Sequence, residues 1–111
     1  MALEIGVDIE EITRFKKMHL NSRFLNIIFT KKEQELCKKK KEPYISFAGK
    51  FCAKEAVIKS WKGKINIKDI EVINSSQGKI EIWIKGKHNP KIKCSVSHTK
   101  KYAVAFVIIE K

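Results

Sequence analysis

The hydrophobic periodicity of this 111-residue chain changes along its length, and the order of these changes restricts the fold more than any other sequence feature. Residues 3–9 alternate between apolar and polar or glycine positions, which predicts a β-strand with Asp8 near its end. Residues 10–61 then carry mainly helical signals, and residues 69–110 return to strand patterns interrupted by turn residues. Helices that precede a run of strands predict an α+β fold with a mainly antiparallel sheet.

Local signals place the boundaries of the longer helices. Thr30, with Glu33 three residues later, has the spacing of a capping box and predicts a helix that runs to about Lys39. Pro43 suits the first turn of a helix, so we expect the longest, central helix to run from there to about Trp61. Two shorter helices are expected before these, at residues 10–18 and 22–29. Four strands are expected after them, at residues 69–74, 79–85, 91–97 and 101–110.

Size and apolar content favour a single domain over residues 1–111. With 43% hydrophobic residues, the chain can bury a core without a metal or a disulfide framework. Cys37, Cys52 and Cys94 are odd in number and far apart, so we expect them to be buried, reduced thiols.

The ends of the chain argue against secretion or membrane insertion. Glu4 and Asp8 stand where a signal peptide carries basic residues. The longest apolar run, residues 102–109, is far shorter than the roughly 20 residues of a membrane-spanning helix. We therefore expect a cytoplasmic protein with no membrane partner.

The charge balance is strongly basic. The chain has 24 lysines and arginines against 12 acids, a formal net charge of +12, yet Arg14 and Arg23 are its only arginines. A nucleic-acid partner, a lysine-rich solvated surface and an acidic protein or polyphosphate partner all agree with this composition. Composition alone leaves the three open.

Glu55 interrupts the apolar face of the longest expected helix. On a helical wheel it falls between Phe51 and Ile58, so its carboxylate needs a counter-ion or a metal. The alternative is an exposed ion pair with Lys59, one helical turn away. Asp8 supplies a second carboxylate, and Mg²⁺ is often held by one or two carboxylates together with substrate phosphates.

Two further features leave a choice between a binding role and a structural role. Lys50 and Lys54 are spaced i, i+4, which suits either a phosphate clamp or a solvated lysine face. His98 lies in a polar stretch between two expected strands, where it is either a turn residue or a ligand of a phosphate.

Three segments carry a specific combination of motifs. Residues 5–14 read I-G-V-D-I-E-E-I-T-R, residues 47–59 read F-A-G-K-F-C-A-K-E-A-V-I-K, and residues 95–103 read S-V-S-H-T-K-K-Y-A. In order and spacing they resemble the signatures of the holo-[acyl-carrier-protein] synthases, the short 4′-phosphopantetheinyl transferases. Weaker likeness continues between them, so the resemblance covers nearly the whole chain. One departure is Lys50, where the family usually has arginine.

The resemblance implies the family's fold and its activity, a transferase reaction. Family members move the 4′-phosphopantetheine arm of coenzyme A onto a serine of apo-acyl carrier protein, with Mg²⁺, and release adenosine 3′,5′-bisphosphate. By similarity, Asp8 and Glu55 are expected to hold the Mg²⁺. Glu55 is also the first choice for the group that accepts the serine proton, and Lys59 is expected to assist the transfer.

The resemblance also assigns the basic residues. Lys54 and Lys59 match lysines expected beside the pyrophosphate, where they would offset developing charge. Lys50 and His98 are expected near the coenzyme A phosphates, with Ser97 and Thr99 as hydrogen-bonding neighbours. Lysine at position 50 keeps the charge but loses the bidentate fork of arginine, so looser phosphate binding is expected.

The acidic carrier protein would account for the surplus of lysine without a nucleic-acid partner. The family docks its carrier on a region that corresponds here to Arg14, Met18, Arg23, Phe24 and Leu25. Relatives of this length form homotrimers with active sites between neighbouring protomers, and the same is expected here.

Two other functions remain as alternatives. A small basic nucleic-acid-binding module would need exposed aromatic residues on a sheet or an arginine-bearing recognition helix, and the sequence contains no RRM aromatic motif and no G-x-x-G loop of the KH type. A transferase homologue that binds carrier protein without catalysis is disfavoured because Asp8, Glu55 and Lys59 are all present.

Overall fold

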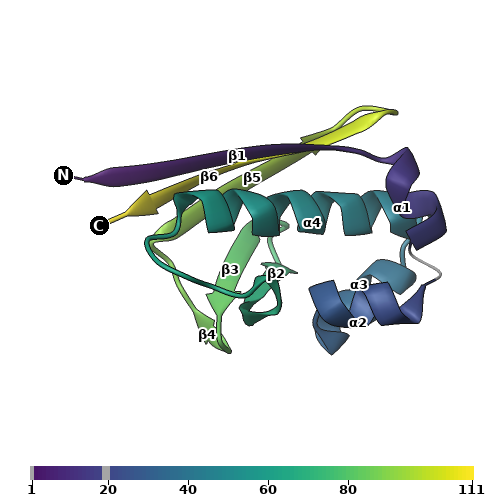
Figure 1. Ribbon diagram of the computed structural model, residues 1–111, viewed down its shortest axis with the longest axis horizontal. Helices are drawn as coiled ribbons and strands as arrows, with labels where there is room; N and C mark the ends of the chain where they lie inside the picture. Colours follow the sequence, from purple (N-terminus) through teal and green to yellow (C-terminus); the bar gives the residue numbers. More distant parts are fainter. Residues whose placement is uncertain (1, 19–20) are drawn as a thin grey trace.

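A long helix packs across one face of an antiparallel sheet in the computed structural model, which describes residues 2–18 and 21–111 (Figure 1). The helix is α4 (Pro43–Ser60). This sheet has the order β1-β6-β5 and contains β1 (Leu3–Glu11), β6 (Tyr102–Glu110) and β5 (Ile92–His98). A second antiparallel sheet has the order β2-β3-β4 and contains β2 (Ile70–Asn74), β3 (Ile80–Ile84) and β4 (Lys87–His88).

The shorter helices gather at one end of α4 (Figure 1). They are α1 (Thr13–Met18), α2 (Ser22–Ile28) and α3 (Lys31–Lys38), and a 3-10 turn, η1 (Ile67–Asp69), leads into β2. The predicted capping box at the start of α3 is confirmed. The Thr30 hydroxyl accepts a hydrogen bond from the Glu33 N–H at 3.2 Å, and the Glu33 carboxylate accepts one from the Thr30 N–H at 2.9 Å.

The predicted α+β class is confirmed, and the differences lie at the element boundaries. The helix expected at residues 10–18 begins only at Thr13, because β1 continues through Glu11. Glu10 and Glu11 pair with Ala103 and Tyr102 of β6. This pairing with a strand more than 90 residues later outweighs the local helical signal. The short strand β4 was not predicted.

The two faces of β1 have opposite surroundings. Its polar and glycine positions, including Gly6 and Asp8, face α4, whereas its apolar positions face outward. The outward side chains are half or more exposed: Leu3 50%, Ile5 63%, Val7 53% and Ile9 61%. The alternating pattern therefore marks a strand whose apolar face is uncovered within one chain.

Gly6 is the point of closest approach between β1 and α4. A Cβ atom at this position would lie 2.1 Å from the carbonyl oxygen of Ala56, well inside van der Waals contact. Only glycine allows α4 to lie this close to the strand. The contact brings the part of α4 that carries Glu55 and Lys59 against Asp8 of β1.

Helix α4 is buried on several sides rather than along one stripe. Its apolar residues Phe47 and Phe51 pack against Phe29 and Phe15, with ring centroids 4.9 Å and 5.4 Å apart. The opposite side carries lysines that are also buried, Lys50 and Lys54. The alternative of a solvated lysine face is therefore wrong.

The thiols largely follow expectation. All three cysteines are free, and Cys37 and Cys52 are buried, whereas Cys94 is only half-buried. In the described part of the chain, no helix combines the length and apolar character needed to cross a membrane.

Replacing Gly6 tests the close contact. We expect Gly6→Ala to lower the free energy of unfolding by about 3 kcal/mol, because a methyl group would force α4 away from β1. Gly63→Ala is the control, since Gly63 has open space around it and a positive φ of +94°, so an added methyl group there strains the backbone without a steric clash. Its expected loss is about 1–2 kcal/mol from backbone strain alone. Urea unfolding measures both losses. If Gly6→Ala lowered the free energy of unfolding by no more than Gly63→Ala does, the interpretation of the close contact would be contradicted.

Candidate functional site

Asp8, Glu55 and Lys59 form a charged cluster where β1 and α4 meet. The Lys59 ammonium donates to the Val7 carbonyl at 2.9 Å and lies 3.3 Å from Asp8 Oδ1. Among the described residues, the ion pair of Lys59 is with Asp8 across the two elements, not with Glu55 along the helix. The i, i+4 ion pair considered from the sequence is therefore replaced by a contact between strand and helix.

Asp8 retains an unused ligand atom. Its side chain is only 10% exposed, and its Oδ2 is buried without a hydrogen-bond partner in the described residues. A buried carboxylate oxygen without a partner is costly. A cation bound at this oxygen would remove that cost.

The carboxylates around Asp8 also carry more negative charge than one lysine balances. Burial and the Asp8 charge raise the pKa of Glu55, and Lys59 partly opposes this. Burial and Asp8 likewise raise the pKa of Glu10 to about 7, against the opposing charge of Arg14. The cluster therefore favours either protonation or an added cation.

The donor set fits Mg²⁺. Asp8 and Glu55 offer hard oxygen ligands, and no group of three or more metal-ligating side chains occurs in the part of the chain that the structure describes. An ion held here would keep several water molecules or take oxygens from a bound phosphate, which is how Mg²⁺ commonly binds.

A cavity of about 490 Å³ lies on another side of α4. It contains two of the expected phosphate-binding residues, Lys50 and His98, and neither Asp8 nor Glu55 lines it. The sequence reasoning missed the rest of its polar lining, for which the only local signal was the lysine run at residues 38–41. The further lining residues include Lys40, Glu42, Ser46, Gly49, Asn74 and Gly78.

The predicted cavity residues differ in how they are held. Lys50 is only 7% exposed and donates to the Val72 carbonyl at 2.8 Å, and burial lowers its pKa. His98 is exposed at the end of β5. Ser97 and Thr99 do not line the cavity, and the Thr99 hydroxyl instead accepts hydrogen bonds from the next turn.

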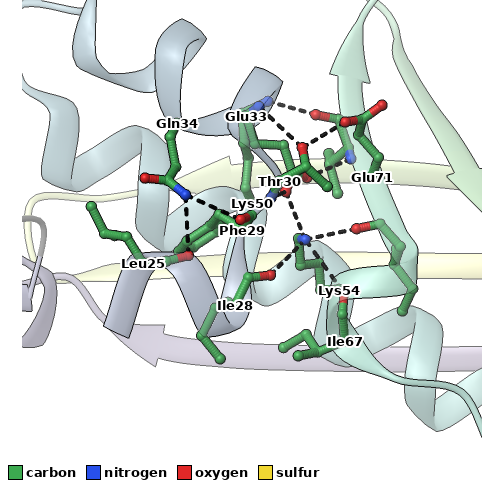
Figure 2. A network of polar contacts seen from close by, with 12 residues as sticks. Leu25, Ile28, Phe29, Thr30, Glu33, Gln34, Lys50, Lys54, Ile67 and Glu71 are labelled. Atoms are coloured by element: carbon green, nitrogen blue, oxygen red, sulfur yellow. Dashed lines mark hydrogen bonds and ion pairs between the residues drawn. The ribbon is translucent and has the colours of Figure 1, made fainter. Parts of the chain in front are cut away.

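Lys54 reaches neither the charged cluster at Asp8 nor the cavity at Lys50, so its expected place beside the pyrophosphate is wrong. Its side chain is fully buried, and its ammonium lies 2.6 Å from Glu33, also fully buried (Figure 2). It donates to the carbonyls of Ile28 and Ile70 at 2.9 Å and 2.7 Å. Burial lowers the pKa of Lys54, and the Glu33 carboxylate opposes that shift. The sequence predicted Glu33 only as a capping residue.

The expected carrier-docking residues lie on α1 and α2. Arg14 and Arg23 are exposed, and Met18 and Phe24 are half-buried. Leu25 is 1% exposed and belongs to the core, so its assignment to docking is wrong. Arg14 also pairs with Glu10 at 2.5 Å, which places this region next to the Asp8 cluster.

The comparison with known protein families decides the relationship. The family model described as the 4′-phosphopantetheinyl transferase superfamily matches residues 4–107. The chain belongs to this superfamily. Its sequence is 43% identical to a holo-[acyl-carrier-protein] synthase of Thermodesulfovibrio yellowstonii over 95% of this chain and 96% of that protein. It is 38% identical to the synthase of Chloroherpeton thalassium over 97% and 98% of the two chains.

Solved structures of holo-[acyl-carrier-protein] synthases share the fold. One, from Bacillus anthracis in complex with CoA (3′,5′-ADP), has a TM-score of 0.82 and 34% identity over 99% of both chains. Another, from Helicobacter pylori in complex with coenzyme A, has a TM-score of 0.79 and 28% identity over 96% of this chain and 99% of that one. The chain is therefore a transferase of the holo-[acyl-carrier-protein] synthase type, as the motifs predicted.

Removing the Glu55 charge tests the electrostatics of the cluster. The folded state raises the pKa of Glu55, so the folded protein binds this proton more tightly than the unfolded chain does. The ionised carboxylate therefore weakens stability as the pH rises through the raised pKa. In EDTA at pH 8 we expect Glu55→Gln to be more stable than the parent, by less than about 1 kcal/mol because the group is only partly buried and solvent screens its charge.

Urea unfolding at pH 8 and pH 4 checks this expectation. The gain should disappear at pH 4, where the parent carboxylate is itself protonated. A Glu55→Gln protein that is less stable at pH 8 would contradict the account of the cluster. Glu35→Gln, which removes an exposed carboxylate on α3 outside the cluster, is the control.

Proposed function

We propose that this chain transfers the 4′-phosphopantetheine arm of coenzyme A to a serine of an apo-acyl carrier protein, in a Mg²⁺-dependent reaction that releases adenosine 3′,5′-bisphosphate. The observation that carries the proposal is the buried Asp8 oxygen without a partner beside Glu55 and Lys59. Transfer of a phosphoryl group needs alignment and charge neutralisation more than covalent help from the protein.

Each residue of the cluster has a defined task in this proposal. Asp8 and Glu55 would hold Mg²⁺, which when bound would neutralise charge on the pyrophosphate oxygens. The Glu55 carboxylate would accept the proton of the attacking serine hydroxyl. Lys59 is oriented by Val7 and Asp8, and its ammonium would offset the charge that develops on the leaving phosphate.

The cavity beside Lys50 and His98 would receive the nucleotide end of coenzyme A. The related synthases of Bacillus anthracis and Helicobacter pylori are described in complexes with this ligand, which supports coenzyme A as the donor. Lys40 adds a third basic side chain to the cavity wall. Because one Lys50 donor is already used by Val72, we expect weaker phosphate binding than an arginine fork would provide.

The acidic carrier protein would dock on α1 and α2. Arg14 and Arg23, the only arginines, are both exposed there, and Met18 and Phe24 add partly exposed apolar surface. Ile27, which is 60% exposed on α2, takes the apolar role that Leu25 cannot fill.

A homotrimer with active sites between protomers is part of the proposal. The outward face of β1 continues onto β6, where Phe106 lies opposite Val7 and Tyr102 opposite Glu11, and both aromatic residues are 44% exposed. An exposed apolar surface of this kind favours association. The Asp8 cluster and the Lys50 cavity do not share lining residues in one chain, so an active site built from two chains would combine them.

One domain over residues 1–111, a cytoplasmic location and the lack of a nucleic-acid partner stay predictions.

Intact-mass spectrometry tests the reaction itself. Apo-acyl carrier protein incubated with this protein, coenzyme A and Mg²⁺ should gain the mass of phosphopantetheine. The gain should vanish with EDTA or with Glu55→Gln, while Glu35→Gln should behave as the parent. No gain with several carrier proteins would contradict the proposed function.

Mixed oligomers test whether the site is shared between chains. Glu55→Gln disables the metal-binding part of the proposed shared active site. The double variant Lys50→Met/His98→Ala disables its cavity part. We expect each to be inactive or nearly so alone, and differently tagged copies co-expressed as mixed trimers to regain activity. Light scattering gives the oligomeric state. Verified mixed trimers without activity would rule out sites formed between protomers.

A further inference from the structure

The outer edge of β2 is covered by side chains rather than by another strand. In the register with β3, the Asp69 carbonyl accepts a hydrogen bond from the Lys85 N–H, and the Ser75 N–H donates to the Lys79 carbonyl. The peptide groups of Ile70 and Val72 therefore point away from β3. Because Ile70 and Val72 are buried, the N–H and C=O groups on this edge need partners within the protein.

Three charged side chains supply these partners. Lys54 donates to the Ile70 carbonyl at 2.7 Å, and Lys50 donates to the Val72 carbonyl at 2.8 Å. Between them, Glu33 Oε2 accepts the Val72 N–H at 2.6 Å. The Val72 residue is thus held at its N–H by α3 and at its carbonyl by α4.

A buried ion pair anchors this arrangement (Figure 2). Glu33 and Lys54 are both fully buried and 2.6 Å apart. The carbonyl of Ile28 takes another Lys54 donor, and the Thr30 N–H donates to Glu33 Oε1. The Phe29 ring lies under the ammonium, 5.3 Å from ring centroid to Nζ. With its donors satisfied, the pair has one well-defined geometry.

The pair is remote from the cavity but connected to it. Lys50 and Val72 line the cavity, whereas Glu33 and Lys54 do not. The direction of the Lys50 ammonium depends on the Val72 carbonyl, and the position of Val72 depends on Glu33. Lys54, one turn further along α4, attaches the same helix to the same strand edge.

We propose that Glu33 and Lys54 are positioning residues for the coenzyme cavity: the buried pair holds the Val72 peptide and α4 together, and so holds Lys50 where it can contact a phosphate of the ligand. This rests on the proposed function. A cation that is already held in place loses less conformational freedom on binding than a free lysine does. The pair therefore raises affinity for coenzyme A without touching it.

The test compares coenzyme A affinity, by titration calorimetry, and kcat, with saturating coenzyme A, across a set of variants. Glu33→Gln and Lys54→Met should each weaken coenzyme A binding by about tenfold and leave kcat within about twofold. Lys50→Met should weaken binding similarly. The decisive variant is Glu33→Gln/Lys50→Met, which should be no weaker than Lys50→Met alone, because both changes act through one contact.

Two further proteins separate positioning from stability. Val107→Ala removes buried volume from β6, away from the β2 edge, and should lower stability with coenzyme A affinity unchanged. If a single variant fails to fold, Glu33→Gln/Lys54→Met replaces it, since removing both charges leaves no unpaired buried ion. It should bind coenzyme A as weakly as the single variants.

Several results would overturn the inference. These are unchanged affinity in folded Glu33 and Lys54 variants, additive losses with Lys50→Met, or an equal loss of affinity in Val107→Ala. A parent protein that binds no coenzyme A would overturn the proposed function and this inference together. A parent that binds and transfers, with variants that bind equally well, would overturn the inference alone.

Discussion

The buried ion pair between Glu33 and Lys54 joins α3, α4 and the edge of β2. Lys54 connects α4 to a carbonyl in the last residue of α2 and to one in the first residue of β2, and Glu33 connects α3 to the same strand edge. Removing one partner of such a pair costs about 3–5 kcal/mol, because an uncompensated charge stays buried. The pair is therefore one of the constraints on how α4 packs against the rest of the chain.

On the opposite side of α4, packing against β1 is determined by steric fit rather than by charge. At Gly6 the helix backbone lies against β1 at a distance that no side chain would allow. Between these two constraints, α4 turns Lys50 toward the cavity and Glu55 and Lys59 toward Asp8. A single rigid helix thus serves a carboxylate cluster and a ligand cavity that do not touch within one chain.

Prediction from the sequence was most successful where the signal was local. The capping box at Thr30 and Glu33 formed as expected, because both partners lie within four residues of each other. The start of α1 was wrong because residues 10 and 11 pair with β6, a contact that local pattern does not contain. Lys54 was misassigned for the same reason: its partners are Glu33 and a strand edge at Ile70, both distant in sequence.

By themselves, the residues determined the α+β class, the capping of α3, and the three motifs that identify the family. They also determined that a carboxylate on the long helix needs a partner. Only the tertiary structure decided which lysine meets which acid, because the burial of Lys54 and Asp8 depends on segments that become neighbours only when α4 packs between β1 and the edge of β2. Spacing along one element defines which side chains share a face, whereas the surroundings of that face are set by the rest of the fold.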